Sequence, residues 1–513
     1  MDYYLVIWAI VVFVESRVET GVDYAELGRR VGFSVPHLRA VFAQYTGQPL
    51  TRYILSRRIS RAAFDAVHGR DTLLDISERY GFSNPDTFTR AFRRMTGVKP
   101  KEFRALRPAV GNVKLCAGVY GVSVSRVNNG IYSNIMKGIE LMKNDKGRIS
   151  VSDGSAVLYG VPKVHYGAFG GCTPYPVCLK AVANYMGINL DYEDAIVQCG
   201  AAFRLVWDAT AWNGGNVDVL LTFEDPSAVY RYGFESLGYE FRLLGRDGKA
   251  KAAEPEKFAM AEDSKAKADF IGFIKESIGR GAPVIALGIV GPPEACLVTG
   301  YRDNGQTLLG WNCFQDSPEY ASSVSIDESG YFVTSAWWEN RDTVAVMAIG
   351  EKTGGAPQPI NAIASRAVEA LTGRQYEKYA KGINAYDAWK KAILDDGQFS
   401  EDMTIPLQIE RLMCQGDAMD CLADGRGSAH KYFKKLAGKD PEQPLYGKIA
   451  EQFAAVAMAV QKMNEALGGW ERGEAQMKAL LKPETRRKLG ALIDAAKAAD
   501  ARALELLKEL AAL

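Results

Sequence analysis

Apolar side chains recur every three or four residues through the first hundred positions, which is the period of helices with one buried face. Tyr24, Leu27 and Val31 form one such group, and a second group centres on Ile76 and Tyr80. Each group is followed by a glycine, a serine and another helical run, over 32–47 and again over 81–97. The pattern therefore predicts two copies of a unit in which two helices flank a glycine-containing turn.

The residues that begin and end helices repeat between the two copies. A serine suits the N-cap, a proline the first turn, and a glycine the position after the last turn. These positions hold Ser34, Pro36 and Gly47 in the first copy, and Ser83, Pro85 and Gly97 in the second. A helix over about 50–67 is predicted to join the copies. The apolar run 5–14 is predicted to be a buried first helix, because ten residues are too few to span a bilayer.

The pattern changes after Pro108. Residues 109–150 are predicted to be a linker and lead-in, with a helix near 134–142. A helix over 177–186 and a structured loop over 207–218 follow, and 244–268 is predicted to be a solvated excursion. Alternating or continuous apolar runs predict strands at 283–290, 295–301, 307–311 and 343–349, with a hairpin at Asn304-Gly305. Residues 151–352 are therefore predicted to be an α+β domain, a helix followed by an antiparallel sheet.

Helical periodicity returns at 353 and continues to the end. Helices are predicted over 376–394, 405–419, 427–436, 446–467 and 483–513. In the last of them one face carries Leu489, Ile493, Ala496, Ala503, Leu507 and Leu510. This face predicts either a helical cap on the sheet domain, which we favour, or a dimerisation helix. The fold class is thus multidomain: an all-α domain (1–108), an α+β domain (151–352) and a helical C-terminal region (353–513).

Charge is distributed unevenly. Residues 1–108 hold 17 basic residues, 15 of them arginine, against 11 acidic ones, while the whole chain has a net charge of +1. A basic module on an acidic body is typical of proteins that bind phosphates. Eight cysteines without a CxxC pair and only four histidines argue against a zinc site or a disulfide framework. We therefore expect a cytoplasmic protein with no metal, no cofactor and no membrane partner.

The doubled helical unit resembles the DNA-binding domain of the AraC/XylS family of transcription regulators over residues 5–107. The resemblance implies double-stranded DNA as a partner, with RNA polymerase and a second copy of the chain as further candidates. It implies DNA contacts by the second helix of each unit and by the joining helix, at His37, Arg39, Gln44, Arg57, Arg58, Asp86, Thr87, Arg90 and Arg94. The first of these helices departs from the family, because it has Ala40 where an arginine is common.

The α+β domain resembles papain-like peptidases that remove double-glycine leader peptides. The resemblance rests on Cys172 before a helix, on 184–187 at the end of that helix, on 294–301 as the strand that a histidine opens, and on 310–312. Glu294 occupies the histidine position, and Cys172 fits the nucleophile only with a shift of two residues. A thiol nucleophile needs a base or cation beside it. The resemblance therefore implies a papain-like fold whose catalysis has lapsed, with no catalytic residue.

A lapsed pocket beside a DNA-binding domain would bind a small-molecule or peptide effector. Five of the eight tryptophans fall in this domain, and aromatic walls with a few polar groups are typical of ligand sites. The candidate ligand residues are Cys172, Trp207, Trp212, Asn216, Asp218, Glu294, Trp311 and Asn312. Glu294 suits a cationic group, although the tryptophans could equally belong to the core. The alternative function is a cysteine hydrolase or acyltransferase that carries a DNA-binding module.

Overall fold

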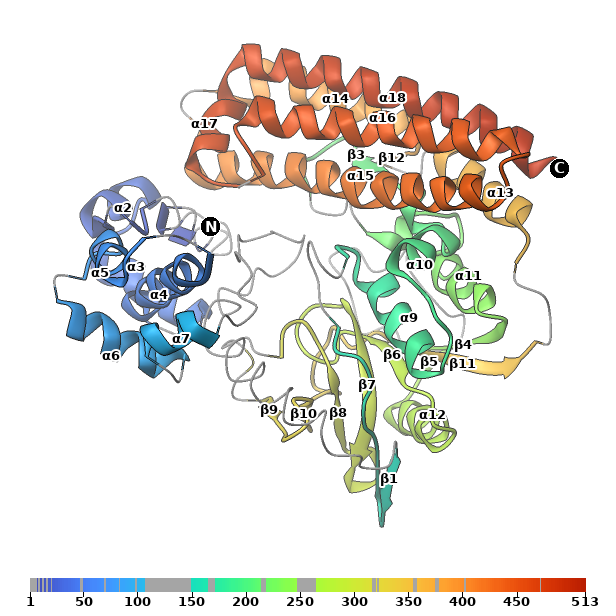
Figure 1. The fold of residues 1–513 in the computed structure, drawn as a ribbon, viewed down its shortest axis with the longest axis horizontal. Helices are drawn as coiled ribbons and strands as arrows, with labels where there is room; N and C mark the ends of the chain where they lie inside the picture. The colour runs from blue at the N-terminus through green and yellow to red at the C-terminus, as the bar shows by residue number, and fades with distance from the viewer. Residues whose placement is uncertain are drawn as a thin grey trace.

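The computed structural model divides the protein into three parts. It describes residues 7, 10–11, 13–14, 17–19, 21–46, 49–68, 71–82, 84–96, 99–106, 149–164, 171–213, 218–246, 264–315, 320, 323–353, 358–373, 378–400, 403–470 and 472–513. We call 7–106 the N-terminal domain, 149–353 the middle region and 358–513 the C-terminal helices. Figure 1 shows the N-terminal domain (blue) beside the other two parts, with the C-terminal helices lying over the middle region.

The described elements of the N-terminal domain are all helices, as the periodicity predicts. Its elements are α2 (Tyr24–Val31), α3 (Val35–Thr46), α4 (Leu50–His68), α5 (Leu73–Arg79), α6 (Pro85–Thr96) and α7 (Pro100–Leu106). The order confirms two helix-turn-helix units, α2–α3 and α5–α6, joined by the single helix α4. Ile10, Val11 and Val14 are helical and buried, and much of the predicted first helix lies outside the described residues.

The middle region is built on one large, mostly antiparallel sheet. Its strands run in the order β5-β4-β11-β6-β7-β8-β10-β9, and the hairpin β1–β2 joins through β2 and β7. Only the β4–β5 pair among these strands is parallel. The strands are β1 (Ile149–Ser152), β2 (Ser155–Leu158), β4 (Tyr239–Arg246), β5 (Ser264–Lys265), β6 (Val284–Leu287), β7 (Ala295–Arg302), β8 (Thr307–Trp311), β9 (Ser325–Ile326), β10 (Phe332–Thr334) and β11 (Ala345–Lys352). The four predicted strands are β6, β7, β8 and β11.

Helices cover the faces of this sheet and lead into it. They are α9 (Pro174–Tyr185), α10 (Tyr192–Gln198), α11 (Ala228–Ser236) and α12 (Lys267–Gly279), with short 3-10 turns η2 (Ala201–Phe203), η4 (Val219–Leu221) and η6 (Asp303–Gly305). The predicted helix at 177–186 is α9, which begins earlier because Pro174 fits its first turn. Of the predicted solvated excursion at 244–268, residues 247–263 lie outside the described residues, and its ends fall in β4, β5 and the first two residues of α12. The helix predicted at 134–142 lies outside the described residues.

The predicted hairpin at Asn304-Gly305 is present. Strands β7 and β8 pair antiparallel, with Tyr301 opposite Leu308. Asp303, Asn304 and Gly305 have φ angles of 52°, 55° and 93°. Positive φ is costly for most residues but tolerated by Asn and Asp and free for Gly. The turn chemistry therefore fixes the register of these two strands.

The C-terminal helices are longer and more interrupted than predicted. They are α13 (Ile360–Thr372), α14 (Ile383–Leu394), α15 (Ile405–Lys439), α16 (Pro444–Leu467), α17 (Glu474–Leu481) and α18 (Pro483–Ala511), with a 3-10 turn η8 (Asp396–Gln398). The prediction of two helices at 405–419 and 427–436 was wrong, because α15 runs through both. A single helix at 376–394 was also wrong, since β12 (Tyr379–Lys381) pairs there with β3 (Val206–Asp208).

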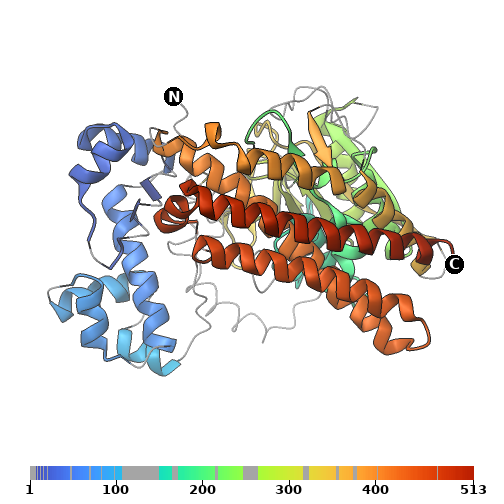
Figure 2. The same cartoon turned by 90° about the horizontal axis from the view of Figure 1, so that it is seen from above.

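The apolar face of α18 is covered within the chain. All six residues of that face are buried, and α18 packs against α13, α14 and α16. This arrangement supports the cap and leaves the predicted dimerisation face occupied. Figure 2 shows α16 and α18 running side by side above the sheet. Among the described helices, none is both long and apolar enough to cross a bilayer.

Two apolar cores hold the parts together. One fills the space between the sheet and its covering helices, including α13 and parts of α15, α16 and α18. The other contains the core of the N-terminal domain together with Trp207, Trp389, Leu412 and Ile493. The C-terminal helices therefore share a core with the sheet on one side and with the N-terminal domain on the other.

Candidate functional site

The first helix-turn-helix unit is held by close backbone contacts at its turn. Asp23 caps α2, accepting hydrogen bonds from the amides of Ala25 (2.8 Å) and Glu26 (3.3 Å). Gly32 follows α2 with a φ of 75°, and the amide of Phe33 donates to the carbonyl of Gly28 at 2.9 Å. A Cβ atom on Gly28 would lie 2.7 Å from the Phe33 carbonyl oxygen. The turn therefore requires glycine at 28 to bring the two helices together.

The second unit repeats this turn with different caps. Thr72 and Asp75 form a reciprocal capping box at the start of α5, with distances of 3.1 and 3.0 Å. Gly81 has a φ of 75°, and the amide of Phe82 donates to the carbonyl of Ser77 at 2.9 Å.

The two second helices are capped at different positions. In the first unit the hydroxyl of Ser34 accepts from the amide of His37 at 3.5 Å. In the second, α6 begins at Pro85, and the side chain of Asn84 accepts from the amide of Asp86 at 2.7 Å. Asparagine is itself a strong N-cap, so the cap lies one residue after the predicted Ser83, which is outside the described residues.

The helix α6 presents a polar face backed by an aromatic row. Phe88 and Phe92 are buried, and their rings contact those of Phe82 and Phe103 at centroid distances near 5.2–5.4 Å. The opposite face exposes Asp86, Thr87, Arg90 and Arg94, all predicted to face DNA, together with Arg93, which the sequence reasoning missed. The adjacent basic pair Arg93-Arg94 was the signal that could have identified it.

The corresponding face of α3 is less free. His37 is exposed, but its ring meets Phe33 edge-on at 4.6 Å. Arg39 is exposed, with its guanidinium 4.5 Å from the centre of the Tyr24 ring. Gln44 was also predicted to contact DNA, but its side chain lies outside the described part of the structure. The polar side chains that reach outward from α3 are thus held by neighbouring aromatic rings.

One predicted arginine of the joining helix α4 requires a correction. Arg57 is only 1% exposed, so it cannot reach a phosphate as predicted. It lies on the same helix face as Tyr53 and Ile54, which are also buried. Arg58 is half-buried, and its guanidinium lies 3.4 Å from where a Cβ on Gly81 would be. The exposed arginine of this helix is Arg52.

In the middle region, two candidate residues, Asp218 and Glu294, lie near one buried tyrosine. Tyr230 is buried, and its carbonyl accepts a 2.7 Å hydrogen bond from the Tyr175 hydroxyl near the start of α9. Burial raises the pKa of the Tyr230 hydroxyl well above its usual value, and the nearby carboxylates of Asp218 and Glu294 raise it further. Burial also raises the pKa of Asp218. Cys172 is exposed two residues before α9.

The predicted aromatic walls do not surround this tyrosine. Trp207 is stacked 5.9 Å from Trp389, and Trp212 meets Phe399 at 5.6 Å, so both belong to the core beneath the C-terminal helices. Trp311 is buried, and its ring nitrogen donates to the carbonyl of Val161 at 2.9 Å. These tryptophans are therefore core residues, and their prediction as walls of one site was wrong.

Two candidate ligand residues remain, Asn312 and Asn216. The Asn312 side chain is buried, and its oxygen accepts from the amide of Phe314 at 2.7 Å, which shapes the turn after β8. Asn216 lies outside the described residues. No group of three or more histidine, cysteine, aspartate or glutamate side chains in the described part of the chain could hold a metal ion.

Comparison with known proteins places the likeness in the N-terminal domain. A helix-turn-helix domain family matches residues 27–106. The multiple antibiotic resistance protein MarA of Escherichia coli (strain K12) is 31% identical over 100 residues, which cover 20% of this chain and 79% of MarA. An uncharacterized HTH-type transcriptional regulator, SAR0107 of Staphylococcus aureus (strain MRSA252), is 32% identical over 98 residues, 19% of this chain and 13% of that protein.

Solved structures match a similar share of the chain. A transcriptional regulator with an AraC-type DNA-binding domain from Chromobacterium violaceum is 26% identical. The overlap covers 21% of this chain and 95% of that one, with a TM-score of 0.20.

Proposed function

This chain belongs to the AraC family of DNA-binding transcriptional regulators, and from that premise we propose that α3 and α6 read one operator. The two helices would enter successive major-groove segments on one face of the duplex. The observation that carries this proposal is α6, whose buried phenylalanines leave Asp86, Thr87 and Arg90 exposed along one face. Arginine is the side chain best suited to bidentate contact with guanine.

Substitution of Arg90 tests this reading. Arg90→Ala should lower affinity for a selected operator by about 1–3 kcal/mol while affecting random DNA much less, because a base contact discriminates sequence. Arg341→Ala, which removes a charge that is also exposed, from the middle region, is the matched control. Equal losses on operator and random DNA in the Arg90→Ala protein would refute a base-reading role.

We further propose that the middle region binds an effector with a cationic group beside Tyr230. Asp218 and Glu294 come from separate elements, before η4 and before β7, yet both act on the same buried tyrosine. Two carboxylates beside a low-dielectric aromatic surface attract an amine or guanidinium more strongly than they would in water. Because Asp218 also caps η4 through the amide of Leu220, the proposal is tested at Glu294.

A panel of mono- and diamines, followed by thermal unfolding, tests this site. We expect at least one amine to raise the melting temperature, and Glu294→Gln to remove most of that rise by removing the charge while keeping the shape. Glu328→Gln, at an exposed position in the same region, should retain it. If no amine shifts the transition, or the shift is equal in both variants, the cationic-effector proposal fails.

A further inference from the structure

One polar path runs from the start of α9 to the N-terminal domain. It begins at Thr173, the residue after Cys172. The Thr173 hydroxyl donates to Asp424 of α15 at 2.9 Å. The Tyr192 hydroxyl donates to the same carboxylate oxygen at 2.6 Å and accepts from the Thr173 amide at 3.0 Å. Thr173 and Tyr192 are buried, so Asp424 ties the beginning of α9 directly to α15.

The helix α15 is fixed at this contact by close packing. Gly425 faces the carbonyl of Ala202 in η2, and a Cβ there would overlap that oxygen. Arg426, fully buried, donates to the carbonyls of Ala202 (2.7 Å) and Arg204 (3.0 Å) and pairs with Asp500 of α18. A displacement at the start of α9 must therefore move α15 or break these hydrogen bonds.

One turn earlier, α15 holds a second arginine. Asp420 lies four residues before Asp424, on the same face of the helix. Arg472 donates to Asp420 at 2.6 Å and to Asp417 at 2.5 Å. Gly416 makes room for this guanidinium, because a Cβ at that position would overlap it. Burial raises the pKa of Asp417 to about 6, against the opposing effect of Arg472.

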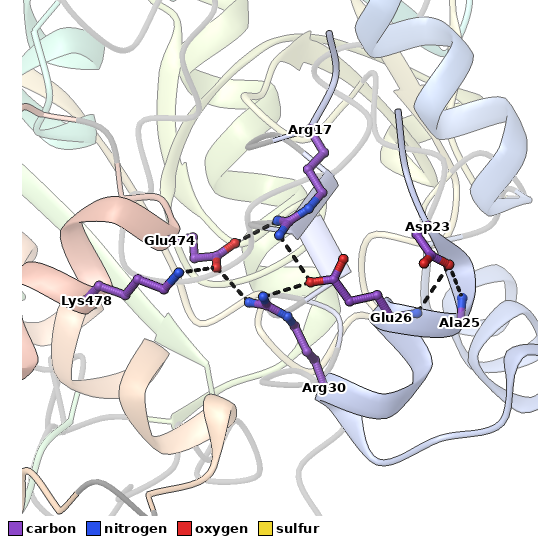
Figure 3. Close-up of polar contacts among 7 residues, drawn as sticks. All are labelled: Arg17, Asp23, Ala25, Glu26, Arg30, Glu474 and Lys478. Atoms are coloured by element: carbon purple, nitrogen blue, oxygen red, sulfur yellow. Dashed lines mark hydrogen bonds and ion pairs between the residues drawn. The ribbon is translucent and has the colours of Figure 1, made fainter. Parts of the chain in front are cut away.

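Arg472 stands two residues before Glu474, which begins α17 and contacts the N-terminal domain. Glu474 accepts from Arg17 at 2.7 Å and from Arg30 of α2 at 2.7 Å, and pairs with Lys478 at 2.9 Å (Figure 3). Glu26 joins the same two arginines at 3.2 and 2.8 Å. Although burial opposes it, these hydrogen bonds lower the pKa of Glu474 to about 2. The carboxylate is therefore charged at neutral pH and joins α17 to the first helix-turn-helix unit.

We propose that α15 and the Arg472–Glu474 segment form a coupling element that transmits the state of the α9 start to the orientation of α2. The signal, an effector beside Tyr230 and the start of α9, rests on the proposed function, whereas the coupling itself does not. The path runs through hydrogen bonds, one turn of α15 and the short segment from Arg472 to Glu474, and it ends at α2 of the first helix-turn-helix unit. An occupant that draws Thr173 away from Asp424 would loosen the hold of Glu474 on Arg17 and Arg30.

A double-mutant cycle tests the coupling without DNA and without any ligand. Thr173→Val removes the hydroxyl that reaches Asp424, and Glu474→Gln weakens the contact with the N-terminal domain. Hydrogen exchange of the α2 amides is measured in the full-length protein. We expect Thr173→Val to speed exchange in α2 by about fivefold or more and to have no further effect once Glu474→Gln is present. Thr343→Val is the control: this buried threonine donates hydrogen bonds to the carbonyls of Gly288 and Trp337, and its substitution should leave exchange in α2 unchanged.

Two results would overturn the coupling. One is unchanged α2 exchange in Thr173→Val, and the other is a full Thr173→Val effect that persists in the Glu474→Gln background, since additivity means independence. If Thr173→Val does not fold, Asp424→Asn removes the charge from the same contact and replaces it in the cycle. Because neither DNA nor effector is present, failure of the proposed DNA reading would leave this outcome unaffected.

Discussion

At the scale of single residues, two glycines of α15 have opposite roles. Gly425 faces the Ala202 carbonyl, with no space for a side chain, whereas Gly427 has no atom within 4 Å of a Cβ. Both lie in a continuous helix, where alanine is intrinsically favoured by about 1 kcal/mol. Comparing the effect of alanine on stability at the two positions therefore separates the contact between α15 and the middle region from helix propensity.

The prediction concerns alanine at these two positions. Gly425→Ala should destabilise the protein by about 1–3 kcal/mol through overpacking, and Gly427→Ala should stabilise it by about 0.5–1 kcal/mol. Urea unfolding of the two variants measures both values. Similar changes in the two proteins would mean that α15 does not press on η2 as described.

The exposure of a residue could be predicted from the sequence where it follows from helix period. Arg90 and Asp86 fall opposite Phe88 and Phe92, so their exposure could be read from the spacing. Arg57 could not be placed in this way, because its burial depends on how the two units pack onto α4. Trp207 was misplaced for the same reason, since its stacking partner Trp389 lies far along the chain.

Among helices and strands, the sequence predicted those elements whose position depends on nearby residues. The strands β7 and β8 and their hairpin followed from apolar runs flanking Asn304-Gly305. The break between β12 and α14 did not, because Gly382 there has a φ of 56° set by pairing of β12 with the distant β3. The sequence also did not predict that two predicted helices form the single helix α15. There Gly416 and Gly425 lie inside one helix, in close contact with Arg472 and with the Ala202 carbonyl.

At the scale of the whole molecule, the C-terminal helices are the joint between the other two parts. They share one apolar core with the sheet and another with the N-terminal domain, and they supply Asp424 and Glu474 to opposite sides. Sequence periodicity predicted their existence but not this position, because the contacts join residues hundreds of positions apart, such as Arg17 and Glu474. The proposed coupling therefore runs through contacts that join all three parts.

Methylation protection measures whether the N-terminal domain reads DNA with two recognition helices. Dimethyl sulfate modifies guanine N7, an atom in the major groove. On a sequence selected by the full-length protein, we predict two protected groups of guanines about one helical turn apart on one face of the duplex. Affinity should fall steeply as salt rises. Failure to select any sequence, or protection confined to a single group with affinity independent of salt, would contradict the account.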